Sequence, residues 1–142
     1  MNGGAFMAYI CGLDRGQLVL FPENLDEYID ENNSIRVMDA FVNQLDIESV
    51  GFLRYVPAKE GRPGYNPRDI LKLYIYGYFN KIRSSRKLMA ECNRNVEVMW
   101  LLKKLVPDFR TIADFRKAHP IALKNVFRSF VPWVYILKSL FQ

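Results

Sequence analysis

Apolar residues recur at three- and four-residue intervals along most of the chain after residue 33, a spacing that predicts amphipathic helices. Asn33 or Ser34 can cap a first helix, whose apolar stripe consists of Ile35, Met38, Val42 and Leu45. Two short apolar runs, residues 17 to 21 and 52 to 56, predict strands instead. We therefore expect a mainly α, compact multi-helix domain, with a possible two-stranded β element near the N-terminus.

The clearest helix start is at residues 66 to 69, where a capping asparagine precedes proline at the first helical position and a carboxylate in the first turn. The apolar face of this long helix would hold Leu71, Tyr74, Ile75, Tyr78 and Ile82. Arg68, Lys72 and Lys81 fall outside that face. Gly77 weakens the interior of the helix, so close packing against another element is expected there.

The next helices are shorter. Ser84 or Ser85 can cap one, residues 93 to 95 predict a turn, and Asn95 can cap another that runs to residue 104. Thr111 and Asp114 have capping-box spacing ahead of a helix over residues 112 to 119. We expect a helix-turn-helix-like array between residues 68 and 119. Pro120 restarts a helix that Pro132 should interrupt, leaving an irregular end.

The 142 residues fit one domain, and their charge is unevenly distributed. The chain carries a net charge of +5, although the first 50 residues hold only Arg15 and Arg36 against a large acidic excess. The surplus of Lys and Arg lies after residue 61. This basic surplus favours an anionic partner, and double-stranded DNA is the leading candidate. Attraction between the acidic and basic parts of one domain is the alternative.

Cationic side chains at helical spacing carry the DNA-binding prediction. Arg83, Arg86 and Lys87 stack like charges on one side of a predicted turn, which a phosphate-facing ridge explains and a solvated face does not require. The predicted phosphate contacts are Lys81, Arg83, Arg86, Lys87 and Arg94. The predicted base contacts are Arg110, Arg116 and Lys117. Neutralising about five phosphates gives an expected slope of log affinity against log salt of roughly −4 to −5.

Few residues suggest catalysis, a metal or a cofactor. His119 is the one histidine, and its position favours packing or capping over base chemistry. The acidic cluster of residues 26 to 31 could bind a divalent ion, although a solvated face is the more common explanation. Cys92 has the helical spacing of a buried thiol. No phosphate-binding glycine loop occurs, and no cofactor, metal or small-molecule substrate is expected.

The location follows from the cysteines and the apolar runs. Two cysteines without a CxxC pair fit a reducing cytoplasm, and we expect association with the nucleoid. Residues 1 to 7 lack the pattern of an export signal. The apolar run of residues 130 to 137 is far shorter than the about 20 residues that a membrane span needs.

Several motifs together resemble one family. They are Leu20-Phe-Pro, Leu25-Asp-Glu-Tyr, Gly61-Arg-Pro-Gly-Tyr-Asn-Pro-Arg-Asp, Leu71-Lys-Leu-Tyr-Ile-Tyr-Gly-Tyr, Ile82-Arg-Ser-Ser-Arg, Glu91-Cys-Asn-Arg-Asn-Val-Glu and Thr111-Ile-Ala-Asp-Phe-Arg. They resemble the N-terminal domain, called InsH N-terminal or DUF772, of IS1182-like, IS5-related bacterial insertion-sequence transposases. The resemblance covers residues 7 to 131, leaving residues 1 to 6 as an extension and 132 to 142 as a divergent tail.

The resemblance implies a helical domain that binds the terminal inverted repeats of the element. In that family a ribonuclease-H-like domain follows, with Asp, Asp and Glu ligands for two metal ions. None of those ligands lies in the part that the resemblance covers, so no catalytic residue and no enzyme activity are expected. We hypothesise a truncated transposase, a hypothesis that an out-of-frame metal-binding domain encoded just downstream would support.

Two other functions compete with DNA binding. In the first, the chain is an interaction or dimerisation module that buries residues 74 to 79 and an exposed tail around Trp133 against another transposase chain. In the second, it is a metal-dependent nuclease in its own right. Replacing Arg83, Arg86 and Lys87 by alanine separates the first from DNA binding, and cleavage assays with and without magnesium test the second.

Overall fold

The computed structural model describes residues 15–16, 24–52 and 64–140. A short 3-10 helix, η2 (Leu25–Tyr28), precedes the six α-helices of these ranges. These are α1 (Ser34–Asn43), α2 (Pro67–Asn80), α3 (Ser85–Arg94), α4 (Val96–Leu101), α5 (Phe109–Ala118) and α6 (Pro120–Leu140). The mainly helical prediction is confirmed. Of the two predicted strands, residues 17 to 21 lie outside the described residues, as does all of 52 to 56 except Phe52, which is not in a strand.

Side-chain caps begin five of the α-helices, since each leaves backbone N–H groups without an intrahelical acceptor. The capping side chains belong to Asn33, Asn66, Ser84, Asn95 and Asp108. The last differs from the prediction: Asp108 accepts from the Arg110 N–H, so α5 begins before Thr111. The predicted turn at residues 93 to 95 is also wrong for Asn93 and Arg94, which continue α3.

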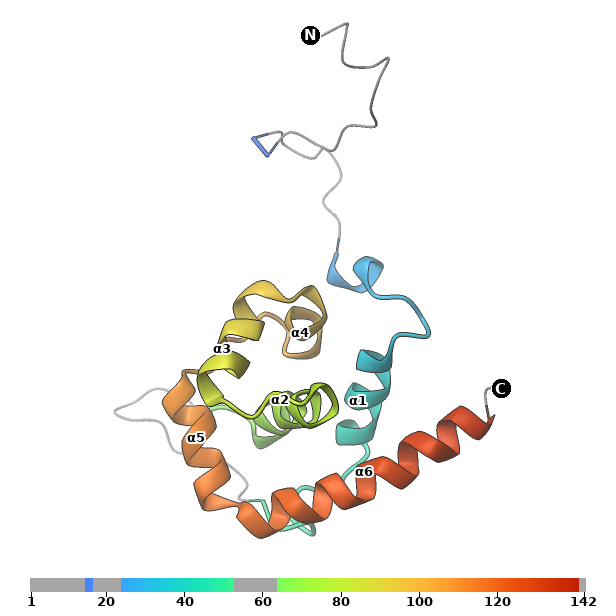
Figure 1. Cartoon of the computed structure of the whole chain (residues 1–142), viewed down its shortest axis with the longest axis vertical. Helices are drawn as coiled ribbons and strands as arrows, with labels where there is room; N and C mark the ends of the chain where they lie inside the picture. Colours follow the sequence, from blue (N-terminus) through green and yellow to red (C-terminus); the bar gives the residue numbers. More distant parts are fainter. Residues whose placement is uncertain (1–14, 17–23, 53–63, 141–142) are drawn as a thin grey trace, which may run out of the picture.

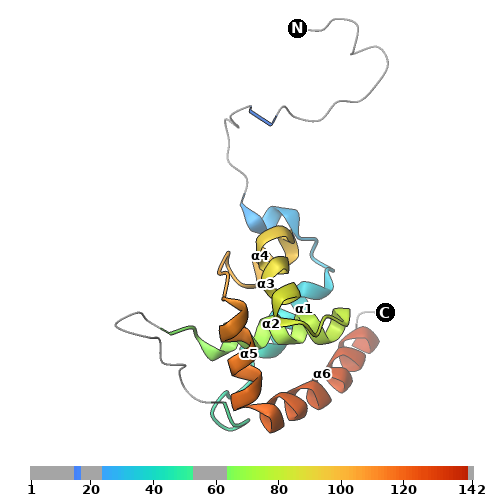
Figure 2. The same cartoon turned by 60° about the vertical axis from the view of Figure 1, so that its left-hand side comes forward.

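Helix α2 forms the centre of the molecule. It packs against α1, α4 and α6, while α3 packs against α4 and α5 (Figure 1). In a second view α6 still runs along the base of the molecule (Figure 2). Eight consecutive residues of α2, 70 to 77, are buried, which accounts for the near-continuous apolar run in its sequence. The fold is therefore a bundle around one helix that is covered on most sides.

Gly77 allows the turn after α2 to close. A Cβ atom at this position would lie 2.6 Å from the Ile82 carbonyl oxygen and 3.0 Å from a methyl carbon of Leu88. The Ile82 N–H donates to the Gly77 carbonyl at 2.8 Å, which folds the chain back toward α3. The predicted close packing at Gly77 is confirmed.

Helix α6 passes through Pro132 without a break, so the predicted interruption and irregular end are wrong. Proline removes the N–H that would bond the carbonyl of Arg128. Both residues are exposed, so the break in the hydrogen-bond ladder lies on the solvent side of α6. Trp133 is half-buried against the Phe41 ring, with ring centroids 5.3 Å apart, and is not the exposed tail that we expected.

Lys72 also departs from the prediction. Lys72 is only 4% exposed, although the sequence pattern placed it outside the apolar face of the helix. Its ammonium lies 2.7 Å from a carboxylate oxygen of Asp39 on α1. The helical pattern of α2 could not indicate this, because the partner that permits burial comes from a distant helix.

Candidate nucleic-acid interface

The outward side of α5 carries exposed cations. Ile112 and Phe115 turn inward, so at 100° per residue Arg110 and Lys117 project from the opposite side, two turns apart. Exposed Asp114 lies between them on the same side. We call Arg110, Lys117 and their neighbour Arg86 on α3 the α5 cation set. Arg86 and Arg110 are neighbours because both guanidinium groups lie near the Phe109 ring, at 3.9 Å and 5.6 Å from its centroid.

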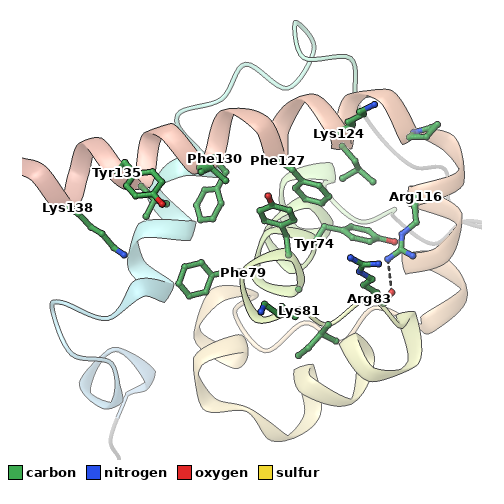
Figure 3. A pocket seen from close by; sticks show the side chains of 17 residues that line it. Tyr74, Phe79, Lys81, Arg83, Arg116, Lys124, Phe127, Phe130, Tyr135 and Lys138 are labelled. Atoms are coloured by element: carbon green, nitrogen blue, oxygen red, sulfur yellow. Dashed lines mark hydrogen bonds between the residues drawn. The ribbon is translucent and has the colours of Figure 1, made fainter.

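Three other predicted cations line a groove between α2 and α6. They are Lys81, Arg83 and Arg116, and the groove has a volume of about 1080 Å³. The Arg116 guanidinium donates to the Arg83 carbonyl at 2.7 Å and lies 5.2 Å from the Tyr74 ring centroid (Figure 3). Arg83 precedes the Ser84 cap, so it is not part of a helical ridge with Arg86 and Lys87 as predicted.

Arg94 is held by an acidic partner. Its Nε donates to Glu91 at 2.8 Å, and the Tyr76 hydroxyl donates to the other carboxylate oxygen at 2.7 Å. The hydrogen bond from Arg94 lowers the pKa of Glu91, while burial raises the pKa of Tyr76. Among the described residues, Arg94 is the one predicted DNA contact that forms an ion pair.

Lys87 lies about 100° around α3 from Arg86, on the side that Arg94 also takes seven residues later. The eight predicted contacts are therefore divided into the α5 cation set, the groove cations, and Lys87 with Arg94 on the far side of α3. All eight residues are exposed. The eight residues are near one another in the sequence, but the helices that carry them point them to three different parts of the surface.

The residues considered for catalysis have structural contacts. Asp26 accepts from Trp100 at 3.0 Å and pairs with Arg36 at 2.9 Å, and the bond from Arg36 lowers the pKa of Asp26. Burial raises the pKa of the Cys92 thiol to about 11. His119 is buried, ends α5 and places Nδ1 3.0 Å from the Phe115 carbonyl oxygen, as a packing histidine would. In the described ranges no three His, Cys, Asp or Glu residues lie close enough to hold a metal ion.

Sequence reasoning missed Phe109, which positions two arginines, and the groove residues Lys124 and Lys138. The adjacency of Phe109 to Arg110 was visible in the chain, but its contact with Arg86 depends on how α3 meets α5. The two lysines are fourteen residues apart on one helix, and only an unbroken α6 places them on the same side. Because we predicted a break at Pro132, we did not expect Lys124 and Lys138 to lie on the same side of one helix.

The model of the family described as Transposase domain (DUF772) matches residues 23–118. The chain belongs to this family. The match ends at the last residue of α5, so the transposase domain contains the α5 cation set while α6 follows it. Membership of this family indicates a role in transposition. No curated protein and no solved structure matches the chain.

None of the described helices, whether in the transposase domain or α6, is both long enough and apolar enough to cross a bilayer.

Proposed function

We propose that this transposase domain binds the ends of its DNA element, the terminal inverted repeats, through the α5 cation set. One observation carries the proposal: Arg86, Arg110 and Lys117 are exposed around α5, and none pairs with a carboxylate of the described residues. Stacking on Phe109 leaves the N–H edges of a guanidinium group free to bond phosphate or base edges. A cation that no carboxylate of the described residues neutralises is available to replace the counterions of DNA.

Within this set, the residues have different tasks. Arg110 lies in the first turn of α5, where a helix entering the major groove reaches base edges. Lys117 lies two turns later, within reach of phosphate. Arg86 approaches from α3 and adds a second phosphate contact. Arg116 is less suited than the sequence suggested, because its guanidinium already bonds the Arg83 carbonyl.

The test is binding to the flanking inverted repeat and to shuffled DNA of equal length, measured by fluorescence anisotropy at several salt concentrations. Two phosphate contacts, from Lys117 and Arg86, give an expected slope of about −1.8, and Lys117→Ala should reduce its magnitude by about 0.9. Arg110→Ala should also reduce the preference for the repeat. Arg128→Ala removes an equal charge from exposed α6 and serves as the matched control.

Asp114 offers a gain-of-binding variant. Its carboxylate lies on the outward side of α5, where it would repel phosphate. Asp114→Asn should tighten DNA binding a few-fold at low salt and lose this advantage as salt rises. A DNA affinity that does not change with salt concentration would contradict the proposal. So would an equal effect of Arg128→Ala and Lys117→Ala on that affinity.

We further propose that this domain binds DNA without cutting it. The proposal follows from the family resemblance, in which the metal-binding carboxylates belong to a separate domain. Incubation of the chain with repeat DNA and magnesium should leave the DNA intact. Magnesium-dependent cleavage that persists after purification to homogeneity would favour the nuclease alternative.

A further inference from the structure

The groove between α2 and α6 is long enough to lie along a helix of a partner. Its α6 wall runs from Pro120 to Lys138, which spans about 27 Å at 1.5 Å per residue. Residues of this wall recur at three- and four-residue intervals, the spacing of a ridge that packs against another helix. They are Pro120, Leu123, Lys124, Phe127, Phe130, Val131, Val134, Tyr135 and Lys138. Figure 3 shows Phe127 and Phe130 projecting from α6 toward α2.

The mouth of the groove exposes large apolar side chains. Tyr78 and Phe79 on α2 are 45% and 44% exposed, and Val131 and Tyr135 on α6 are 39% and 68% exposed. Clustered exposed apolar residues of this kind mark interaction sites more often than isolated ones do. The groove therefore offers an apolar floor to a partner.

Every charged residue that lines the groove, among those that the structure describes, is a cation. These residues are Lys81, Arg83, Arg116, Lys124 and Lys138. Lys81 adopts a left-handed conformation, with φ of 60°, at the C-cap of α2. Glycine would be less strained there, so the lysine side chain is present despite a backbone cost of about 1 kcal/mol. An apolar trough with cations on both sides complements a helix that has an apolar stripe and acidic flanks.

We propose that this groove docks an acidic amphipathic helix of a partner protein, a function separate from DNA binding by the α5 cation set. A second copy of α6 is a poor occupant. That helix carries Lys124, Arg128 and Lys138 and no acidic residue, so pairing two copies would bring like charges together.

A single nucleic-acid strand is also a poor occupant, because stacking needs open ring faces. The Tyr78 ring already stacks on Phe127, with centroids 4.6 Å apart and 12° between the ring planes. Phe79 packs edge-on against Phe130. Of the three exposed rings, Tyr135 alone has no ring contact among the described residues, so a strand would find one open ring, whereas the ridge spacing fits a helix along the whole wall.

The experiment uses the full chain and a designed peptide of about 18 residues, with leucine at helical three- and four-residue spacing and glutamate elsewhere. A matched peptide replaces every glutamate by lysine. Fluorescence anisotropy should show the acidic peptide binding roughly tenfold or more tightly than the basic one, and increasing salt should weaken it.

Exposed residues of α6 supply the variants. Val131→Asp combined with Tyr135→Asp should weaken the acidic peptide roughly tenfold or more and leave the affinity for repeat DNA unchanged. Ile136→Asp combined with Ser139→Asp places the same two charges on the same helix at exposed residues outside the groove, and this variant should bind the peptide normally. Circular dichroism melting checks that all variants fold.

Three results would overturn the proposal. The basic peptide could bind as well as the acidic one, a single-stranded oligothymidylate could bind the groove more tightly than the acidic peptide, or the chain could form a dimer that Tyr135→Asp dissociates. The failure of DNA binding leaves this proposal standing, since the two sites are tested with different ligands and different variants.

Discussion

Charged side chains are paired in the interior around α2 but unpaired along the surface of α5 and α6, among the described residues. Around α2, buried Lys72 pairs with Asp39 and buried Glu91 pairs with exposed Arg94, and each pair joins or braces helices. Along α5 and α6, the described residues form no ion pair, although the two helices carry six Lys and Arg residues against Asp114. Charges that stabilise the fold are matched within the chain, whereas the unmatched ones are available to ligands.

The two regions also differ in how they use apolar residues. Those of α2 are mostly buried, while Ile121, Tyr135, Ile136 and Leu140 of α6 are more than half exposed. Helix α6 lies beyond the residues that the transposase family model matches. We therefore expect variants in the interior to change stability, and variants along α5 and α6 to change binding.

The largest effect is expected at Lys72. Lys72→Ala leaves the Asp39 carboxylate without its partner and should lower the free energy of unfolding by about 3 kcal/mol, measured by urea denaturation. Adding Asp39→Leu should recover part of the loss, because no unpaired charge then remains. A loss below about 1 kcal/mol for the single variant would place this pair with the surface ion pairs.

Gly77→Ala should lower the free energy of unfolding by about 2 kcal/mol. The new methyl group would lie 2.6 Å from the Ile82 carbonyl oxygen, and that clash outweighs the better helix propensity of alanine. Gly16→Ala is the control, because no atom of the other described residues lies within 4 Å of its added Cβ, apart from the neighbours in the chain. Thermal melting of both variants measures the difference, and equal melting temperatures would show that the turn after α2 adjusts freely.

Glu91→Gln should lower the free energy of unfolding by about 1.5 kcal/mol at pH 7. The hydrogen bond from Arg94 lowers the pKa of Glu91 in the folded chain below its usual 4.5. The glutamate therefore contributes its stability above pH 4.5 and loses it as the pH falls through the folded pKa. Urea denaturation at pH 7 and pH 3 should show the difference from the parent chain shrinking, while exposed Glu31→Gln has little effect at either pH.

The smallest effect on stability is expected at Lys81, which lies both at the end of α2 and in the groove. Lys81→Gly relieves the left-handed backbone at the end of α2 and should raise the free energy of unfolding by about 1 kcal/mol. The same change removes a cation from the groove and should weaken the acidic peptide. Lys81→Ala removes the charge without relieving the backbone, so it should weaken the peptide with no gain in stability.

Local signals in the sequence predicted much of the fold. Asn66 and Pro67 began α2 where expected, and Asn33, Ser84 and Asn95 capped their helices. Two predictions of helix boundaries were wrong. The capping-box spacing at Thr111 hid the actual cap of α5, which is Asp108. Pro132 does not interrupt α6, because it lies on the solvent side of the helix.

The candidate site was less predictable than the helices. All eight predicted cations are exposed, but they lie on three separate faces of the molecule. Arg86 reaches Phe109 only because α3 packs against α5, and Arg116 turns to the Arg83 carbonyl across the same contact. No spacing along one helix contains that information.

By itself, the sequence determined the helices, their caps, the family and the excess of basic residues, because these depend on neighbours within about two turns or on the composition. The tertiary structure decided which charges are paired and which remain open. A charge becomes buried or available according to the helix that packs over it, as Lys72 and Lys117 show. That choice depends on contacts between segments far apart in the chain.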